Sequence, residues 1–395
     1  MDDAHLAGLG RVLQHLLLAS YGMYPEDLER ELNAAVRHLG GDDVVLLLAD
    51  YDQQLLVGFN RTDERRFLID GPGPGLSYRQ ERVIEEALDD GRRRLWIPAK
   101  DSAERHGVLG VVDDGSVPDR HWETVASLIG ELIVSKSLYG DHITLRKRGA
   151  PFSLAAEMRW GLLPPLTFTS PDVTIAGVVH PSHGIAGDAF DYGVTSRTAS
   201  LTILDAMGHG LEASRMANVA VGCARNARRA GADPVATLLA VDEAIATQFG
   251  DSRFVTAQVA TYDLDTGRLE VANAGHPPPL RLRPGHPVET LDCRPARPAG
   301  LGTEPSSTTV QLDPGDGVLF RTDGIVEARS PDGDFFGDER LAGIVAEMTD
   351  RGAPPSEILR RSMQVLVEHQ DGRSSDDATL LLLRRSDDAR LTGRD

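Results

Sequence analysis

The chain has 395 residues, 41% of them hydrophobic, and a formal net charge of −19 at pH 7. This length predicts two or three domains with sizeable cores. The acidic excess argues against nucleic acid or an anionic membrane as the main partner, because binding to phosphates requires basic patches. A protein or a divalent cation suits such a chain better.

Cysteine usage and the N-terminus indicate a cytoplasmic protein. The two cysteines, Cys223 and Cys293, form neither a disulfide framework nor a zinc-binding spacing, which is typical of a reducing compartment. The longest apolar run near the start, residues 16–19, is far shorter than the roughly 20 residues that span a bilayer. The acidic residues that follow Met1 are unlike the basic start of a signal peptide.

Residues 1–140 are predicted to form a small α+β domain. Their apolar periodicity predicts helices over 5–19 and 25–39, strands over 44–48 and 54–57, a loop at 71–75, a helix around 78–88, strands at 95–97 and 107–112, and a long helix over about 122–139. This order resembles a GAF-type sensor domain, and a generic α+β dimerisation domain is the alternative. No signature residue identifies a ligand for it.

Residues 141–152 are expected to be a linker, whose basic cluster Arg146-Lys-Arg148 is most simply a solvated surface. A helix over 153–163 follows, which Ser153 can cap. From residue 172 onward strands and helices cluster by type, which favours α+β layers over alternating units. The expected strands are 173–179, 199–204, 255–262, 268–272, 279–282, 317–321 and 378–384, and the expected helices are 212–230 and 235–249. The polar tail, 386–395, is predicted to be disordered.

Aspartates stand at four of these strand edges. Asp188 and Asp205 adjoin strand-like runs, and a glycine-rich turn follows the second of them. Asp323 follows another apolar run, and the pair Asp376 and Asp377 precedes the last strand. A single aspartate at such a place is better explained as a cap or a turn residue. Four strand edges together favour a site for a dication with oxygen ligands.

Seven motifs now identify a family. They are Ala156-Glu-Met-Arg-Trp-Gly-Leu-Leu-Pro-Pro165, Ala186-Gly-Asp-Ala-Phe-Asp-Tyr192, Asp205-Ala-Met-Gly-His-Gly210, Phe254-Val-Thr-Ala257, Ala272-Asn-Ala-Gly-His-Pro-Pro278, Thr322-Asp-Gly-Ile-Val-Glu-Ala328 and Ser375-Asp-Asp-Ala-Thr379. In this order, residues 153–385 resemble the SpoIIE/RsbU-like branch of the metal-dependent 2C-type (PPM) serine/threonine protein phosphatases.

The resemblance implies an αββα sandwich, in which helices flank two antiparallel sheets, and two Mn²⁺ or Mg²⁺ ions at one edge. The implied metal ligands are Asp188, Asp205 as the bridging residue, the carbonyl oxygen of Ala206, Asp323 and Asp376. Asp376 is preferred to Asp377 because the family ligand is the first residue of its acidic pair. Alanine replaces a common glycine at 206 and at 186, and neither change removes a side-chain ligand.

The implied reaction is hydrolysis of a phosphoserine or phosphothreonine by a metal-activated water, without an enzyme nucleophile. The implied substrate is a STAS-type anti-anti-sigma protein of a partner-switching pathway. The alternative is a catalytically inactive binding or scaffold protein of such a pathway. In both cases the N-terminal domain is expected to regulate the C-terminal one.

Cysteine and histidine chemistry is less well supported. Cys223 and Arg229 satisfy the Cys-x5-Arg spacing of cysteine phosphatases, but the stretch lacks glycine and continues a helical pattern, so Cys223 is expected to be a helix residue. His209 is expected to be a turn residue with a hydrogen-bonding role, and His276 to buttress a strand end. His180 and His183 are interpreted as loop residues.

A homodimer is expected from two apolar stripes that a monomer would have to cover. The stripes are Leu128, Ile129, Leu132 and Ile133 in the long helix, and Leu154, Met158 and Leu162 in the helix after the linker. In the resembling family these helices act as a switch that completes the metal site. Activity is therefore expected to depend on residues 1–140 and on the register of the linker.

Overall fold

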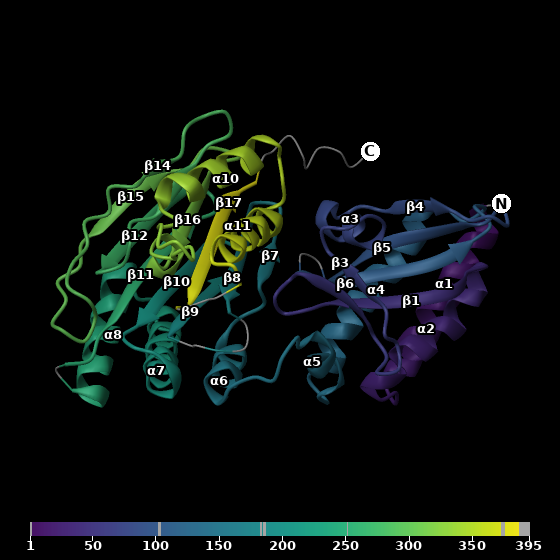
Figure 1. The fold of residues 1–395 in the computed structure, drawn as a ribbon, viewed down its shortest axis with the longest axis horizontal. Coiled ribbons are helices and arrows are strands. Elements are labelled where there is room, and N and C mark those ends of the chain that lie inside the picture. The colour runs from purple at the N-terminus through teal and green to yellow at the C-terminus, as the bar shows by residue number, and fades with distance from the viewer. Residues whose placement is uncertain are drawn as a thin grey trace. The chain divides into compact units, whose positions relative to one another are not determined.

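The computed structural model divides the chain into two compact units, Met1–Pro151 and Phe152–Asp395 (Figure 1). It describes residues 2–101, 104–181, 184, 187–250, 252–372 and 376–386. Most of the predicted tail, 387–395, lies outside these residues. In the part of the chain described, no helix is both long and apolar enough to cross a membrane.

The N-terminal unit is built on one six-stranded antiparallel sheet with the order β3-β2-β1-β6-β5-β4. Its elements are α1 (Asp2–Ser20), η1 (Pro25–Asp27), α2 (Leu28–Val36), η2 (Arg37–Leu39), β1 (Asp42–Ala49), β2 (Leu55–Gly58), β3 (Arg66–Leu68), α3 (Pro74–Gln80), β4 (Ile84–Ala87), β5 (Arg93–Asp101), β6 (Glu104–Asp113), α4 (Asp119–Ser137) and α5 (His142–Lys147).

Both faces of this sheet are covered, which explains the continuous apolar run of β1. Successive side chains of a strand point to opposite faces. Leu46 and Leu48 pack with α1, α2 and α4 in one core, whereas Val45 and Leu47 pack with Tyr78 of α3 in a second, smaller one. The sheet therefore lies between two layers rather than against one.

The prediction of a helix around residues 78–88 is wrong. Helix α3 ends at Gln80, and Glu81 takes a left-handed conformation with φ of 52°. Residues 84–87 then form the edge strand β4, which pairs with β5. The exposed carboxyl side chains of this edge give it a helix-like composition, and one of them, Glu86, accepts a hydrogen bond from the Trp96 indole at 3.0 Å.

Most of the segment expected to be a linker folds onto the N-terminal unit. Helix α5 contacts β1, β2 and η1. The Arg146 guanidinium donates to the carbonyl oxygens of Gly58 at 2.6 Å and Asp63 at 3.0 Å, so it is not simply solvated as the sequence suggested. Between α5 and the next helix, only a few residues around 148–153 remain outside regular elements.

The C-terminal unit contains two antiparallel sheets, with the orders β15-β12-β11-β10-β9 and β14-β13-β16-β17-β8-β7. Its elements are α6 (Leu154–Leu162), β7 (Thr167–Thr169), β8 (Val173–His180), β9 (Asp188–Val194), β10 (Thr198–Ala206), α7 (Gly210–Arg229), α8 (Pro234–Phe249), β11 (Val255–Asp263), β12 (Arg268–Ala274), β13 (Leu280–Leu282), β14 (Glu289–Thr290), β15 (Ser307–Gln311), β16 (Gly317–Arg321), α9 (Asp323–Val326), α10 (Asp338–Asp350), α11 (Pro355–His369) and β17 (Ala378–Arg385).

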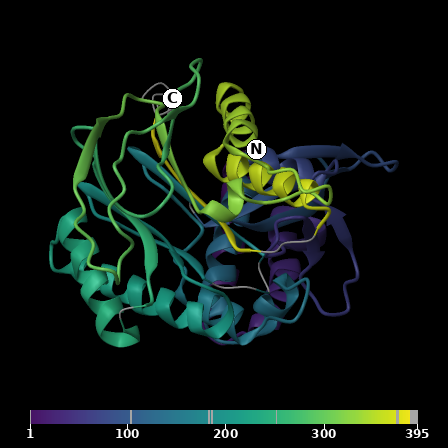
Figure 2. The same cartoon turned by 60° about the vertical axis from the view of Figure 1, so that its left-hand side comes forward.

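The two sheets pack face to face, and helices cover their outer faces (Figure 2). One core lies between the sheets, a second lies under α7 and α8, and a third lies under α10 and α11. Phe190 of β9 fills the inter-sheet space that Gly177 of β8 leaves open. The predicted α+β class and the four-layer αββα order of this unit are confirmed.

The apolar stripe on the long helix does not require a partner chain. Ile129, Leu132 and Ile133 are buried in the core of their own unit, and Leu128 packs against that core. On α6, Leu162 is buried but Leu154 is exposed. The apolar stripe of α4 therefore does not predict a dimer, because α4 covers its own sheet.

Candidate functional site

The aspartates expected as metal ligands come together at one end of the C-terminal sandwich. Asp188 begins β9 and lies directly across from Asp205 near the end of β10. Asp323 follows β16 as the first residue of α9, and Asp376 precedes β17. Each sheet thus contributes two carboxylates through neighbouring strands.

Asp188 is the most enclosed of the four. Its side chain is 2% exposed and accepts a hydrogen bond from the Thr322 hydroxyl at 2.7 Å. That hydroxyl also accepts from the amide of Thr379 at 2.9 Å, so it joins the two sheets. Burial, and next the negative charges of Asp205 and Asp377, hold the pKa of Asp188 well above its ordinary value.

Asp205 is the electrostatic centre of the cluster. Burial, and next the negative charges of Asp323, Asp376 and Asp377, together raise its pKa to about 7. It is hydrogen bonded to Asp188, an arrangement that two carboxyl groups can adopt only if one of them carries a proton. A bound cation would relieve the same repulsion without that proton.

Asp323 and Asp376 are brought together by a close approach of two backbones. A side chain at Gly324 would overlap the carbonyl oxygen of Asp377, so only glycine lets α9 start against the beginning of β17. Burial, then Glu327 and Asp376, raise the pKa of Asp323. Glu327 is a further carboxylate that the sequence argument did not single out.

The carbonyl oxygen of Ala206 lies beside Gly187. A Cβ atom at 187 would stand 2.9 Å from that oxygen and 3.4 Å from Oδ1 of Asp205. The Ala206 amide donates to the Gly187 carbonyl at 3.1 Å. After Ala206, glycines with φ of 91° at 208 and 73° at 210 make the expected turn into α7.

Asp377 has a different environment from Asp376. It is 3% exposed, whereas Asp376 is exposed to solvent. Its Oδ1 accepts from Arg159 of α6 at 2.7 Å, and its Oδ2 accepts from the amide of Gly187 at 2.6 Å. Arg159, itself 1% exposed, also donates to the carbonyl of Pro181. Asp377 therefore ties α6 to the segment that carries Asp188.

These side chains have the chemistry of a site for hard dications. Carboxylate and carbonyl oxygens are the ligands that Mg²⁺ and Mn²⁺ prefer, and burial together with the neighbouring carboxylates raises the pKa values of Asp188 and Asp205. Among the residues described, no group of three or more His, Cys, Asp or Glu is arranged to hold a metal ion.

The histidines and cysteines singled out from the sequence belong to several different elements. His276 is buried, its Nδ1 lies 2.9 Å from the Thr256 hydroxyl at the start of β11, and burial lowers its pKa to about 3, as suits a neutral buttress. His209 precedes α7 without a side-chain cap. His180 ends β8 rather than lying in a loop, and His183 lies outside the described residues.

Cys223 lies inside α7, as expected, and burial raises the pKa of its thiol. A raised pKa works against a thiolate nucleophile. Thr322 and the link between Arg159 and Asp377 were not predicted from the sequence. The signal for the latter was present, since Arg159 shares the buried helix face of Ala155 and Leu162.

Comparison with known proteins agrees with this geometry. The family model described as Stage II sporulation protein E (SpoIIE) matches residues 195–386, a stretch that contains every expected ligand except Asp188. Protein IcfG of Synechocystis sp. is 34% identical over 148 residues, which are 36% of this chain and 22% of that protein.

Solved structures show the same likeness. The RsbU and RsbW domains of a Mycobacterium tuberculosis protein superpose with a TM-score of 0.50 and 26% identity, covering 56% of this chain and 62% of that one. The SiaA-PP2C domain of Pseudomonas aeruginosa gives a TM-score of 0.49 and 22% identity over 58% of this chain and 93% of that one. The chain thus spans about a fifth of IcfG and less than two thirds of the mycobacterial chain. Residues 195–386 of its C-terminal unit thus match a SpoIIE domain, and this unit has a PP2C-like fold.

Proposed function

We propose that the protein is a metal-dependent phosphatase that hydrolyses a phosphoserine or phosphothreonine of a regulatory protein. The observation that carries the proposal is the meeting of Asp188, Asp205, Asp323 and Asp376 at one end of a PP2C-type sandwich. Cys223 lies in α7 and the pKa of its thiol is raised, which works against a thiolate nucleophile, so the reaction assigned to the site is attack by water.

The ligands of two Mn²⁺ or Mg²⁺ ions would be the four aspartates and the carbonyl oxygen of Ala206. When bound, such ions supply activation of water and stabilise charge on the phosphoryl oxygens. The chain contributes the positioning. Thr322 fixes the carboxylate of Asp188, and the glycines at 187 and 324 permit the close backbone contacts around it.

The direct test is turnover of a phosphoserine peptide by the purified chain with Mn²⁺ or Mg²⁺, before and after EDTA. The proposal expects hydrolysis that stops with EDTA and returns with metal. Binding of the phosphoprotein without hydrolysis, at every metal concentration, would favour the alternative of an inactive scaffold protein.

The substrate class we propose is a phosphorylated STAS-type protein of a partner-switching pathway. It is supported by the likeness to a chain that joins an RsbU domain to an RsbW domain. A pull-down with the Asp205→Asn variant as a trap, followed by phosphosite mapping, tests it. The free cysteines, Cys223 and Cys293, support a reducing compartment such as the cytoplasm.

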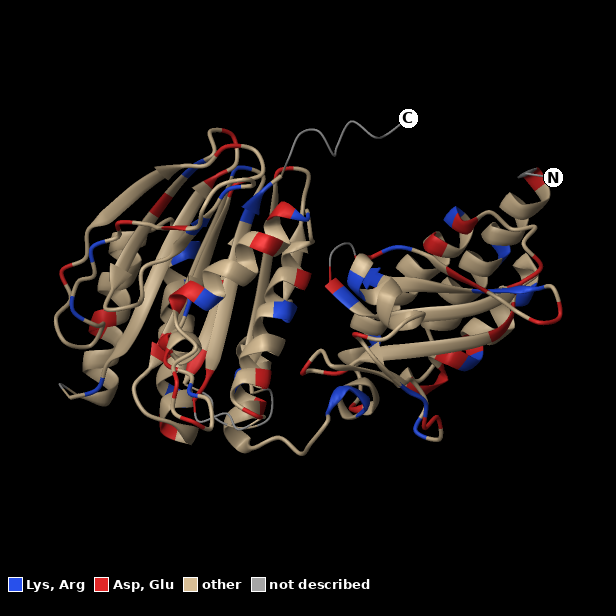
Figure 3. Cartoon of the chain, turned by 45° about the horizontal axis from the view of Figure 1, so that its top comes forward, with Lys and Arg blue, Asp and Glu red and all other residues tan. Residues whose placement is uncertain are grey.

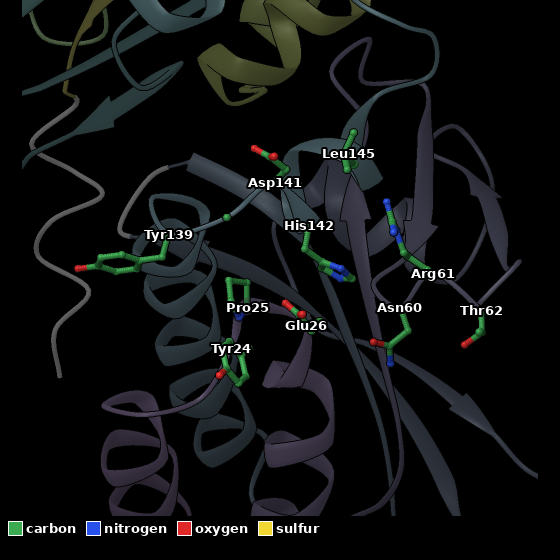
Figure 4. A pocket seen from close by; sticks show the side chains of 11 residues that line it. Tyr24, Pro25, Glu26, Asn60, Arg61, Thr62, Tyr139, Asp141, His142 and Leu145 are labelled. Carbon is green, nitrogen blue, oxygen red and sulfur yellow. The ribbon is translucent and has the colours of Figure 1, made fainter.

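For the N-terminal unit we propose a GAF-like regulatory role. A cavity of about 620 Å³ lies between η1, the turn after β2 and the turn from α4 to α5, and Glu26, Arg61 and His142 are among its lining residues (Figure 4). A ligand there would contact the segment that leads toward α6. If the N-terminal unit regulates the C-terminal unit through the segment between α5 and α6, insertion of one to four residues after Gly149 should change turnover. Unchanged turnover in all four variants would contradict this coupling.

We also propose a homodimer, with an interface on α1 in place of the α4 stripe. Leu6, Leu17 and Leu18 of α1 are each more than half exposed, which is unusual for leucines of one helix. The double variant Leu17→Glu/Leu18→Glu should be monomeric by light scattering, and an unchanged dimer mass would move the interface elsewhere.

A further inference from the structure

Two arginines flank a cavity on the loop between β14 and β15. The cavity has a volume of about 400 Å³, and Arg294 and Arg297 line it together with Glu304 and Ser306. Both guanidinium groups belong to exposed residues. Within the described residues neither makes a hydrogen bond or an ion pair, so both charges are available to a partner.

The loop that carries this cavity is held in place by hydrogen bonds to its backbone. Oδ1 of Asp242 in α8 accepts hydrogen bonds from the amides of Gly300 at 2.7 Å, Gly302 at 3.0 Å and Thr303 at 3.1 Å. Ala299 exchanges two backbone hydrogen bonds of 2.9 Å with Val255. The loop therefore presents its charges without first having to become ordered.

The register of the sheet places this loop beside the aspartate cluster. Ala206 lies across from Val255, and Val255 in turn lies across from Ala299. Adjacent strands are roughly 4.8 Å apart, so Ala299 is on the order of 10 Å from Ala206. A protein partner typically covers about 800 Å² of each surface, a patch with a radius of roughly 16 Å. A protein bound at the aspartates would therefore also cover the part of this loop around Ala299.

We propose that Arg294 and Arg297 dock acidic side chains that flank the phosphorylated residue of the protein substrate. This inference rests on the proposed phosphatase function and specifies the substrate. The chain as a whole has a net charge of −19, with Asp and Glu residues on both units, and would repel an acidic partner elsewhere (Figure 3). With Glu304 in the same cavity, the local charge of these three residues is +1, which favours carboxylates over neutral or basic side chains.

The test compares two phosphoserine peptides of equal length, one with aspartates beside the phosphoserine and one with asparagines there. In the double variant Arg294→Gln/Arg297→Gln, kcat/KM for the acidic peptide should fall about threefold to tenfold, as expected for two exposed ion pairs. Hydrolysis of the amide peptide and of p-nitrophenyl phosphate should not change. Added salt should reduce the difference, since exposed charges are screened.

A matched control removes the same charge from the opposite end of the same sheet. Arg197 and Arg229 are exposed, and Arg197 lies in the turn between β9 and β10, far from Asp205. The variant Arg197→Gln/Arg229→Gln should retain full activity on the acidic peptide. An equal loss in both double variants, or equal losses on both peptides, would overturn the docking site.

Peptide binding separates this inference from the proposed function. Fluorescence anisotropy of the labelled acidic phosphopeptide, measured with EDTA to prevent turnover, should show weaker binding by the Arg294→Gln/Arg297→Gln variant. If the wild type hydrolyses both peptides but binds them equally, the docking site is wrong and the phosphatase stands. If the wild type binds the acidic peptide preferentially but never hydrolyses it, the docking site stands and the phosphatase is wrong.

Discussion

Replacing Arg159 by methionine would break a buried ion pair beside the aspartate cluster while keeping most of the side-chain volume. The substitution removes the 2.7 Å bond to Asp377 and the bond to the Pro181 carbonyl. Asp377, 3% exposed, would remain buried without its cation, next to Asp188 and Asp205. Loss of one partner of a buried pair typically costs about 3–5 kcal/mol of stability.

The Arg159→Met substitution should also change the structure locally, around Gly187, in addition to lowering overall stability. Because Asp377 also accepts from the Gly187 amide, hydrogen exchange measured by mass spectrometry should lose protection at residues 187–190. Calorimetric Mn²⁺ affinity should fall as well. The double variant Arg159→Met/Asp377→Asn should recover part of the lost stability, since the unpaired charge is gone.

Arg360→Met provides the control. Arg360 forms a buried pair with Glu357 at 2.8 Å within α11, and its removal should destabilise the fold without changing exchange at 187–190 or Mn²⁺ affinity. The reasoning is refuted if Arg159→Met unfolds within about 1 kcal/mol of the wild type and keeps its exchange pattern, since breaking a buried pair should cost several times more.

Three further predictions concern other residues. Burial raises the pKa of Asp50 from 3.8 to about 6, so its carboxyl favours folding below pH 4 and this contribution is lost as the pH rises through 6. Asp50→Asn, whose oxygen can accept the same two amides, should therefore stabilise the N-terminal unit in urea unfolding by about 3 kcal/mol at pH 7 but only about 0.5 kcal/mol at pH 4; an equal gain at both would contradict the assignment. Gly324→Ala should lower Mn²⁺ affinity by calorimetry because its Cβ would displace the Asp377 backbone, and unchanged affinity would show that the contact is dispensable. Cys223→Ser should keep full metal-dependent turnover, and a folded but inactive variant would revive a thiolate mechanism.

The elements of the C-terminal unit were predictable where the apolar periodicity of a segment agrees with glycines at its ends. The strands around Asp205 and Asp323 and the helices α7 and α8 occur close to their predicted ranges. Short edge strands such as β7 and β14 were not predicted, because two or three residues carry no periodicity. The prediction at 78–88 failed for a related reason, since tertiary pairing overrode the helix-like composition of β4.

The aspartates of the site were predictable as residues, but their supports were not. Resemblance selects Asp188, Asp205, Asp323 and Asp376, while the contacts that hold them depend on segments far apart in the sequence. The Thr322 hydroxyl bonds across the sheets, and Arg159 reaches a residue 218 positions later. The end of the N-terminal domain was predicted too early for the same reason. The contacts of Arg146 with β2 and the following turn join distant residues and leave no pattern in the local sequence.

The most direct test of the metal-dependent phosphatase is turnover of a phosphoserine peptide against Mn²⁺ concentration for the wild type and Asp205→Asn. The account predicts metal-dependent turnover in the wild type and none above background in the variant. Without metal the variant should be at least as stable as the wild type, because it removes a carboxyl that Asp323, Asp376 and Asp377 repel. Turnover of Asp205→Asn near the wild-type level at saturating Mn²⁺ would contradict the assignment of the site.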